Sequence, residues 1–443
     1  MNNILHKFYI LKTWEKAVIL FMLFFPIRFI FGIFSEFWLE DEQQIYLIGL
    51  KFYSTGYWPY FGPDVVYTNS QIPGALQGLL VGLPFFILHI PEAPYILLNL
   101  LTFFSLFLLA LYIKKCRTPD VPEWFLWTWI FAAPWALNYS THIINPSYVL
   151  PAAVFFFVSM METLPAFRKG FLNYYLSFFL MGFSTLWIFQ LHMSWILLMP
   201  FIAVVFFMAI RNGSLKFILS FFVFTAGCIL AASLVIPTFI KFGLAGGSGD
   251  TASNILLNSS NIKEIFTVLL RFLSFGSFEL TRFMGSNTNA RMDYLAENIW
   301  ASPFIVFVGI TGVAQIAWMI IAWFRKNSFP EWKAMKFLIL SAFLVTYFSF
   351  FFSVKGPSSH TFYLMFPLVM IYSFYCWQPL FNKKWVRTIV AIFLISGIVF
   401  HVTLALHNFK NKSMYKDRQK PLSAIQQKNY KILGERRNFD RND

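Results

Sequence analysis

Long apolar stretches separated by short polar connectors dominate this chain. The first runs from Ala17 to Phe34, and runs of similar length recur to about residue 406. A bilayer core needs about 20 apolar helical residues to span it, and unbroken runs of this length exceed what soluble helices show. The pattern therefore predicts an all-α, polytopic integral membrane protein with about 11 transmembrane helices, within a range of roughly 10 to 13.

The predicted crossings have approximate bounds 17–35, 94–113, 122–138, 147–163, 171–189, 192–210, 216–237, 301–323, 335–354, 360–378 and 386–406. The segment 72–90 is apolar too, but it is rich in Gly and Pro and ends in "HIPEAP" without a basic residue. If it crossed, the "KKCR" connector that follows the next helix would lie outside, against the positive-inside rule. We therefore predict a juxtamembrane segment at the outer surface, buried on protein.

The net charge of +15 does not indicate a nucleic-acid partner, because charged residues are only 12% of the chain and the basic ones cluster in short connectors. Such clusters are typical of cytoplasmic loops. The expected division is a transmembrane module 1–237 with a first outer loop 36–71, an extracytoplasmic loop 238–300, C-terminal helices 301–406 and a basic tail 407–443. Eleven crossings leave that tail outside, against the charge rule, and an even number would reverse it.

The three cysteines, Cys116, Cys228 and Cys376, are too scattered to indicate a zinc site or a disulfide framework. No metal site is predicted and no cofactor is expected, although a divalent cation at Glu40, Asp41 and Glu42 stays open as an alternative. The first apolar run lacks a small-residue cleavage site, so it is expected to remain as a spanning helix.

The stretch "FWLEDEQQIYLIGLKFYSTGYWP", residues 37–59, contains the candidate chemistry. Three consecutive carboxylates follow the first predicted span, and "GYWPYFGPD" then combines aromatic residues with Gly and Pro. This composition is typical of a shaped loop at a membrane surface. A carboxylate held beside such a loop can act as a general base on a hydroxyl or amine. The alternative is that these acids are solvated boundary residues.

The order Asp41-Glu42, a helical stretch, Gly56-x-Trp58-Pro59 and then Gly62 resembles the first outer loop of the GT-C glycosyltransferases, in particular the protein mannosyltransferase and aminoarabinose transferase branch. The resemblance implies a polyprenyl-phosphate sugar as donor, a lipid, glycan or protein as acceptor, and inversion at the sugar. It also implies that Asp41 is the catalytic base with Glu42 shaping the site, that Trp58 lies at the substrate, and that the enzyme acts outside the bacterial inner membrane.

Two departures from that branch change the expected site. Gln71-Ile72-Pro73 stands where the branch commonly has Lys-Pro-Pro, so another cation must bind the lipid phosphate. We expect it among His192, Lys355 and His360, which lie in predicted outer turns. The alternative for His192 is a purely structural histidine, and the alternative for Lys355 is a lysine that snorkels at the membrane boundary. Asn145 stands where the branch often has an aspartate before a proline, and an amide can bind a sugar hydroxyl but cannot act as a base.

Two other classes of protein remain open. An O-antigen-type polysaccharide polymerase would depend on arginines in outer loops, for which Arg271, Arg282 and Arg291 are the candidates. A lipid-linked glycan flippase or transporter would show charges within helices and internal repeats, and neither is evident in the sequence.

Overall fold

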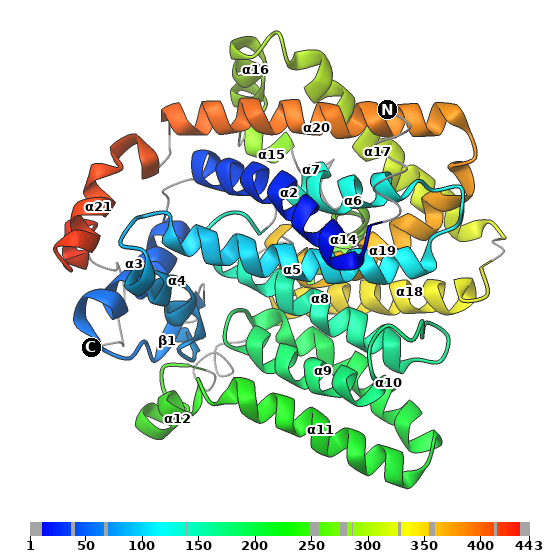
Figure 1. The fold of residues 1–443 in the computed structure, drawn as a ribbon, viewed down its shortest axis with the longest axis horizontal. Coiled ribbons are helices and arrows are strands. Elements are labelled where there is room, and N and C mark those ends of the chain that lie inside the picture. The colour runs from blue at the N-terminus through cyan, green and yellow to red at the C-terminus, as the bar shows by residue number, and fades with distance from the viewer. Residues whose placement is uncertain are drawn as a thin grey trace.

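The fold is a bundle of long apolar helices, as the sequence predicts (Figure 1). The computed structural model describes residues 11–36, 40–65, 70–138, 140–247, 257–274, 281–285, 287–326, 329–353, 359–411 and 414–434. Within these residues, eight helices are long and apolar enough to cross a membrane: Thr13–Ser35 (α2), Ala93–Cys116 (α5), Asn145–Thr163 (α8), Met193–Arg211 (η1 with α10), Ser214–Ala232 (α11), Ser302–Phe324 (α17), Trp332–Phe352 (α18 with η3) and Lys384–Lys410, part of Lys384–Asn411 (α20).

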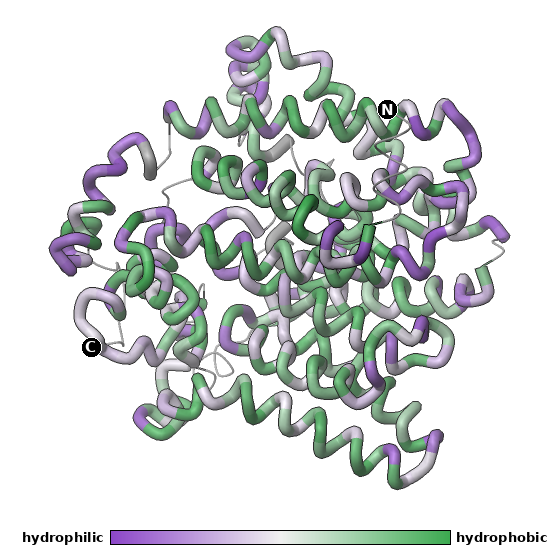
Figure 2. Tube along the Cα trace, in the orientation of Figure 1, coloured by the Kyte–Doolittle hydropathy of each residue, from purple (hydrophilic) through white to green (hydrophobic). Residues whose placement is uncertain are grey.

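The remaining predicted crossings are shorter or interrupted. They are Tyr174–Phe189 (α9), the pair Glu123–Ala132 (α6) and Pro134–Asn138 (α7), and Ser359–Met365 (η4) followed by Phe366–Trp377 (α19). The outward faces of the long helices carry large exposed apolar residues, such as Phe207, Phe222 and Phe337. Figure 2 shows the helices of the bundle as mainly hydrophobic and the connectors as hydrophilic. Apolar surface on this scale indicates contact with lipid, and the chain is an integral membrane protein.

Elements that do not span complete the described chain. They are Glu40–Thr55 (α3), strands Phe61–Val65 (β1) and Ser70–Pro73 (β2), Leu76–Ile87 (α4), Ile236–Phe242 (α12), Ser259–Glu264 (η2), Ile265–Ser274 (α14), Thr281–Met284 (α15), Thr288–Glu297 (α16), Gln378–Leu380 (η5), Met414–Asp417 (η6), Gln419–Gln426 (α21) and Tyr430–Ile432 (η7). At 12 residues, α4 is about 18 Å long, which falls short of the roughly 30 Å of a bilayer core.

A small antiparallel hairpin interrupts the otherwise helical chain. Asp64 of β1 pairs with Gln71 of β2, Phe61 pairs with Pro73, and the register shifts between Phe61 and Asp64. Pro63 lies at this shift, where its missing N–H costs no ladder hydrogen bond. Alternation of apolar and polar residues over so few positions gives little strand signal, so the sequence did not predict the hairpin.

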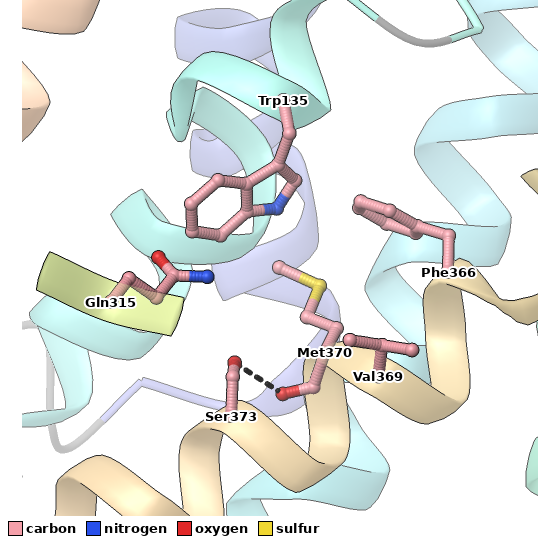
Figure 3. Close-up of a pocket in the computed structure, with 6 residues that line it drawn as sticks. All are labelled: Trp135, Gln315, Phe366, Val369, Met370 and Ser373. Carbon is pink, nitrogen blue, oxygen red and sulfur yellow. Dashed lines mark hydrogen bonds between the residues drawn. The ribbon is translucent and has the colours of Figure 1, made fainter. Parts of the chain in front are cut away.

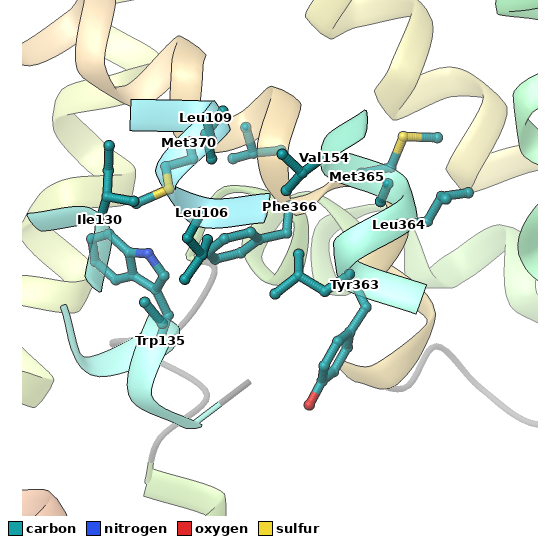
Figure 4. Packing of buried hydrophobic residues seen from close by; sticks show 14 of the residues in the cluster. Leu106, Leu109, Ile130, Trp135, Val154, Tyr363, Leu364, Met365, Phe366 and Met370 are labelled. Atoms are coloured by element: carbon teal, nitrogen blue, oxygen red, sulfur yellow. The ribbon is translucent and has the colours of Figure 1, made fainter. Parts of the chain in front are cut away.

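The buried core lies where α5, α6, α7, α8 and α19 meet (Figure 4). Leu106 and Leu109 of α5, Val154 of α8 and Phe366 of α19 are almost completely buried there. On the side of α8 away from this core, α9 and α11 pack closely because glycines face backbone carbonyls: Gly182 faces Phe224, and Gly227 faces Phe179. Small residues at such contacts let apolar helices approach without a clash.

A buried arginine within the first span accompanies the break between α6 and α7. The Arg28 guanidinium is 1% exposed and donates to the carbonyls of Phe131 and Ala136. Pro134 interrupts the helix ladder at this point and leaves carbonyls in need of donors. Arg28 therefore closes a structural gap, which accounts for a charge inside a span without a transport role.

The bundle has two distinct ends. One carries the connectors around residues 114–123, 162–171, 325–331 and 381–387, which are joined by Arg387 donating to the Asp120 carbonyl (3.1 Å) and by the Lys169–Glu331 pair (2.7 Å). The other carries α3, the hairpin, α4, α12 and α21, which gather at the left of Figure 1. We call them the connector end and the acidic end.

The last helix runs parallel to the first. Asn408 of α20 donates to the Ser35 carbonyl at the end of α2 (3.1 Å), and the rings of Phe31 and His401 lie 4.6 Å apart one to two turns earlier. The residues after α20 therefore emerge at the acidic end, beside the first loop. Helix α20 continues to Asn411, beyond its predicted end.

Candidate functional site

The predicted catalytic pair lies in the first turn of α3. Asp41 is exposed and Glu42 is half-buried, while the side chain of Glu40 is outside what the structure describes. A helix N-terminus favours negative charge because its unpaired N–H groups carry partial positive charge. The exposed Asp41 carboxylate is open to a reactant, whereas Glu42 faces partly into the protein.

A third carboxylate, Glu36, lies directly after α2 and was not singled out from the sequence. It is 1% exposed, and its Oε2 accepts the backbone N–H of Ile143 at 2.7 Å. Glu36 follows the negative end of the α2 dipole, where an acid is disfavoured. An acidic residue directly after a spanning helix conflicts with the helix dipole, and this conflict is the sequence signal that could have identified Glu36.

Residues 140–143, between α7 and α8, enclose Glu36 at the acidic end. The carbonyl of Thr141 touches α2 at Gly32, where any side chain would clash. One residue on, His142 Nε2 lies 2.7 Å from the Ser35 hydroxyl. These contacts fix residues 140–143 across the end of α2, so that the Ile143 N–H points at the Glu36 carboxylate.

Both titratable groups of this arrangement have shifted pKa values. Burial raises the pKa of Glu36 well above 4.5 and the nearby charge of Glu42 raises it further, while the Ile143 N–H and the Tyr95 hydroxyl act in the opposite direction. Burial lowers the pKa of His142 to about 4. At neutral pH the site accordingly contains a neutral imidazole and a carboxyl group biased towards its protonated form.

The structure brings two predicted substrate-binding residues into neighbouring turns. Asn145 begins α8 and its Nδ2 donates to the Leu191 carbonyl at 3.1 Å. His192 follows Leu191 and caps η1, since its Nδ1 accepts the Ser194 N–H at 3.1 Å and lies 2.8 Å from the Ser194 hydroxyl. Asn145 thus joins the start of α8 to the turn after α9, whereas His192 caps η1 within that turn.

Trp58 and the hairpin follow α3 in the chain, and β1 packs against that helix. Trp58 is half-buried, and its indole N–H has no hydrogen-bond acceptor among the described residues. Gln71, the residue at the position of the expected lysine, is buried and donates to Asp64 Oδ1 at 2.9 Å. Gln44 of α3 donates to the other Asp64 oxygen. Asp64 thus joins the hairpin to α3 through Gln44, while the Gln71 amide orients the Asp64 carboxylate within the hairpin.

The structure reveals a cation at the hairpin that sequence reasoning missed. Lys241 of α12 is exposed, and its Nζ lies 4.3 Å from the ring centroid of Tyr60 and 5.0 Å from that of Phe242. The Thr238 hydroxyl donates to the Tyr60 carbonyl at 2.6 Å, which fixes α12 on the hairpin. Lysine after an apolar helix end is common, so the sequence carried no signal for this contact.

The other predicted cations are only partly described. Lys355 lies outside the described residues, and His360 belongs to η4 but its side chain is likewise not described. Of the arginines weighed for a polymerase, Arg271 is half-buried in α14, and Arg291 donates to the Gly285 carbonyl at 3.0 Å. The side chain of Arg282 is not described.

Within the described ranges no group of three His, Cys, Asp or Glu side chains is placed to hold a metal ion. A small cavity lies between α7, α17 and α19, lined by Trp135, Gln315, Phe366, Val369, Met370 and Ser373 (Figure 3). It has room for about one water molecule. This cavity is far too small for a lipid-linked sugar.

No family model matches the chain, and no curated protein matches it. Among solved structures, the chain is similar to ArnT from Cupriavidus metallidurans in the apo state, with 13% sequence identity and a TM-score of 0.45 over 89% of this chain and 77% of that one. The similarity is distant, and neither fold nor function is inferred from it.

Proposed function

We propose that this chain is a membrane glycosyltransferase that transfers a sugar from a polyprenyl-phosphate donor to an acceptor outside the membrane. The observation that carries the proposal is the position of Asp41. It is an exposed carboxylate in the first turn of α3, the helix that follows a membrane span, and the aromatic turn containing Trp58 comes directly after the other end of this helix. This is the order of elements for which the sequence resembles the GT-C enzymes.

In the proposed reaction, Asp41 accepts the proton of the acceptor hydroxyl or amine as that atom attacks the anomeric carbon. The bond between the anomeric carbon and the phosphate oxygen breaks, so the configuration inverts and the polyprenyl phosphate leaves as an anion. Glu42 shapes the site, with Asn145 and Trp58 at the sugar. His192, Lys355 and His360 stabilise the leaving phosphate, since charge that develops in the transition state is where fixed cations are most effective.

The substitution Asp41→Asn separates chemistry from folding, because it keeps the size of the side chain and removes the basic oxygen. Turnover of a polyprenyl-phosphate hexose by the purified protein in nanodiscs should fall by at least about 100-fold, the usual effect of losing a positioned base. The matched control is Asp120→Asn, an exposed aspartate at the connector end.

If Asp41→Asn keeps normal turnover, Asp41 is not the base. If only Glu42→Gln loses turnover, the base is Glu42. If both variants stay active, the carboxylates are boundary residues. Mass spectrometry of cell-surface glycans with and without the gene identifies the sugar and its acceptor. An unchanged glycan profile, together with no turnover by the wild type, would contradict the proposal.

A further inference from the structure

The C-terminal segment 414–434 does not extend into solvent as a basic tail. It forms η6, α21 and η7 and returns along the acidic end, where η7 contacts α3; α21 is the red helix at the left of Figure 1. Three sets of contacts join it to the rest of the chain: one to the start of α5, one to the start of α3 and one to the end of α3.

The contact at α5 is a two-point ion pair. Arg418 Nε lies 2.6 Å from Glu92 Oε1, and Arg418 Nη2 lies 3.0 Å from Glu92 Oε2. Glu92 immediately precedes α5 at its N-cap position and follows α4 in the chain. An arginine that uses two donors on one carboxylate fixes orientation as well as distance. Arg418 therefore sets where the returning segment begins.

The contacts at α3 lie at both ends of that helix. Gln43 Nε2, one residue after Glu42, donates to the Leu433 carbonyl at 3.0 Å. Near the other end, Lys51 Nζ lies 5.8 Å from the Tyr430 ring centroid, and Lys428 Nζ lies 5.5 Å from that of Tyr53. Contacts at both ends constrain the rotation of a helix as well as its position.

The returning segment buries an apolar face. Ala424 and Ile425 of α21 are completely buried, and Leu433 is 5% exposed. The polar residues Gln419 and Lys420 of the same helix are exposed. Burial of one face with the other in solvent is the pattern of a docked amphipathic helix, and it distinguishes the segment from a solvated tail.

We propose that residues 414–434 form a strap that positions α3, and with it the Asp41–Glu42 pair. The strap is held by Arg418 on Glu92 and by η7 on Gln43. The role of the pair rests on the proposed function, whereas the hold on α3 does not. A base is effective only when it is held at the correct distance and angle from the reacting atom, and a shift of about 1 Å can cost about 100-fold in rate. Helix α3 packs on α4 along one side, and the strap supplies contacts along another.

Charge reversal at the ion pair tests the strap. The full chain in nanodiscs is compared as Arg418→Glu, Glu92→Arg, the double reversal, and Lys420→Glu, an exposed residue of α21 that makes the same charge change. The rate of hydrogen exchange in peptides covering residues 40–55 reports how firmly the strap constrains α3. Turnover of a polyprenyl-phosphate hexose reports the position of the carboxylates.

Each single reversal should speed exchange in α3 by about fivefold or more, the change that corresponds to losing a well-oriented surface ion pair. Turnover should fall with it, and the double reversal should restore both while Lys420→Glu changes neither. Unchanged exchange in Arg418→Glu would overturn the strap, and faster exchange with unchanged turnover would overturn its positioning role. If the wild type itself transfers no sugar, the proposed function has failed, and the exchange measurement still decides whether the strap holds α3.

Discussion

Glu36 at the acidic end differs in its surroundings from Glu123 and Glu331 at the connector end. At the connector end, Glu123 lies 2.9 Å from Lys16 and 2.8 Å from Lys114, and Glu331 lies 2.7 Å from Lys169. At the acidic end, Glu36 is also buried, but the groups that stabilise its charge are neutral, namely the Ile143 N–H at 2.7 Å and the Tyr95 hydroxyl. Glu123 and Glu331 at the connector end are therefore paired with lysines, whereas Glu36 at the acidic end has no cationic partner in the described residues.

The pKa values show what this difference means. Burial alone raises the pKa of Glu331, but the Lys169 ammonium and the Tyr375 hydroxyl reverse the effect, so its pKa lies below the ordinary value. The pKa of Glu36 lies well above that value because burial dominates. Paired acids stabilise the fold, while a carboxyl that costs energy to ionise is typical of a functional region. The comparison supports placing the chemistry at the acidic end.

The largest expected difference between the ends is in their accessibility from outside the cell. In a chain whose three cysteines are replaced by alanine, Asp417→Cys in the strap should react with an impermeant thiol reagent added to intact cells. Asp120→Cys at the connector end should react only after permeabilisation, because the positive-inside rule places the basic connectors in the cytoplasm. The reverse result would invert the whole topology, and labelling of both positions would contradict the helix order.

Breaking a pair at the connector end should destabilise the protein clearly. Lys169→Met leaves Glu331, 7% exposed, without its ammonium partner. The expected loss is about 1 to 3 kcal/mol of unfolding free energy, since a buried carboxylate that loses a charged donor keeps its desolvation cost. Thermal unfolding in detergent measures it, with the exposed Lys115→Met as the matched control. If adding Glu331→Gln to Lys169→Met recovers no stability, the pair is not the cause.

The smallest effect is expected for Glu36→Gln, and it depends on pH. Because the folded pKa of Glu36 is raised, its stabilising contribution is complete below pH 4.5 and is lost as the pH rises through the folded value. The wild type should thus lose unfolding free energy over this rise, and the Glu36→Gln variant should not. Unfolding midpoints between pH 5 and 8 measure the difference, with Asp120→Asn as the control. Equal slopes for the wild type and Glu36→Gln would mean that Glu36 is ionised throughout.

The sequence by itself determined that this protein is a bundle of membrane-spanning helices, because a bilayer core demands long apolar helices whatever their neighbours are. It also indicated Asp41 and Glu42, since an acidic run after a span followed by an ordered aromatic turn is a local pattern. Lys355 and His360 remain predictions from the sequence.

Only the tertiary structure decided what surrounds the acids at the acidic end of the bundle and which segments meet there. The burial of Glu36 depends on Gly32 admitting a loop that lies more than a hundred residues away in the chain. The return of the C-terminal segment onto α3 depends on Arg418 meeting Glu92, and nothing in the basic tail indicates that partner. Local patterns follow from the period of a helix and the thickness of a membrane, whereas contacts between distant segments depend on how all the helices pack together.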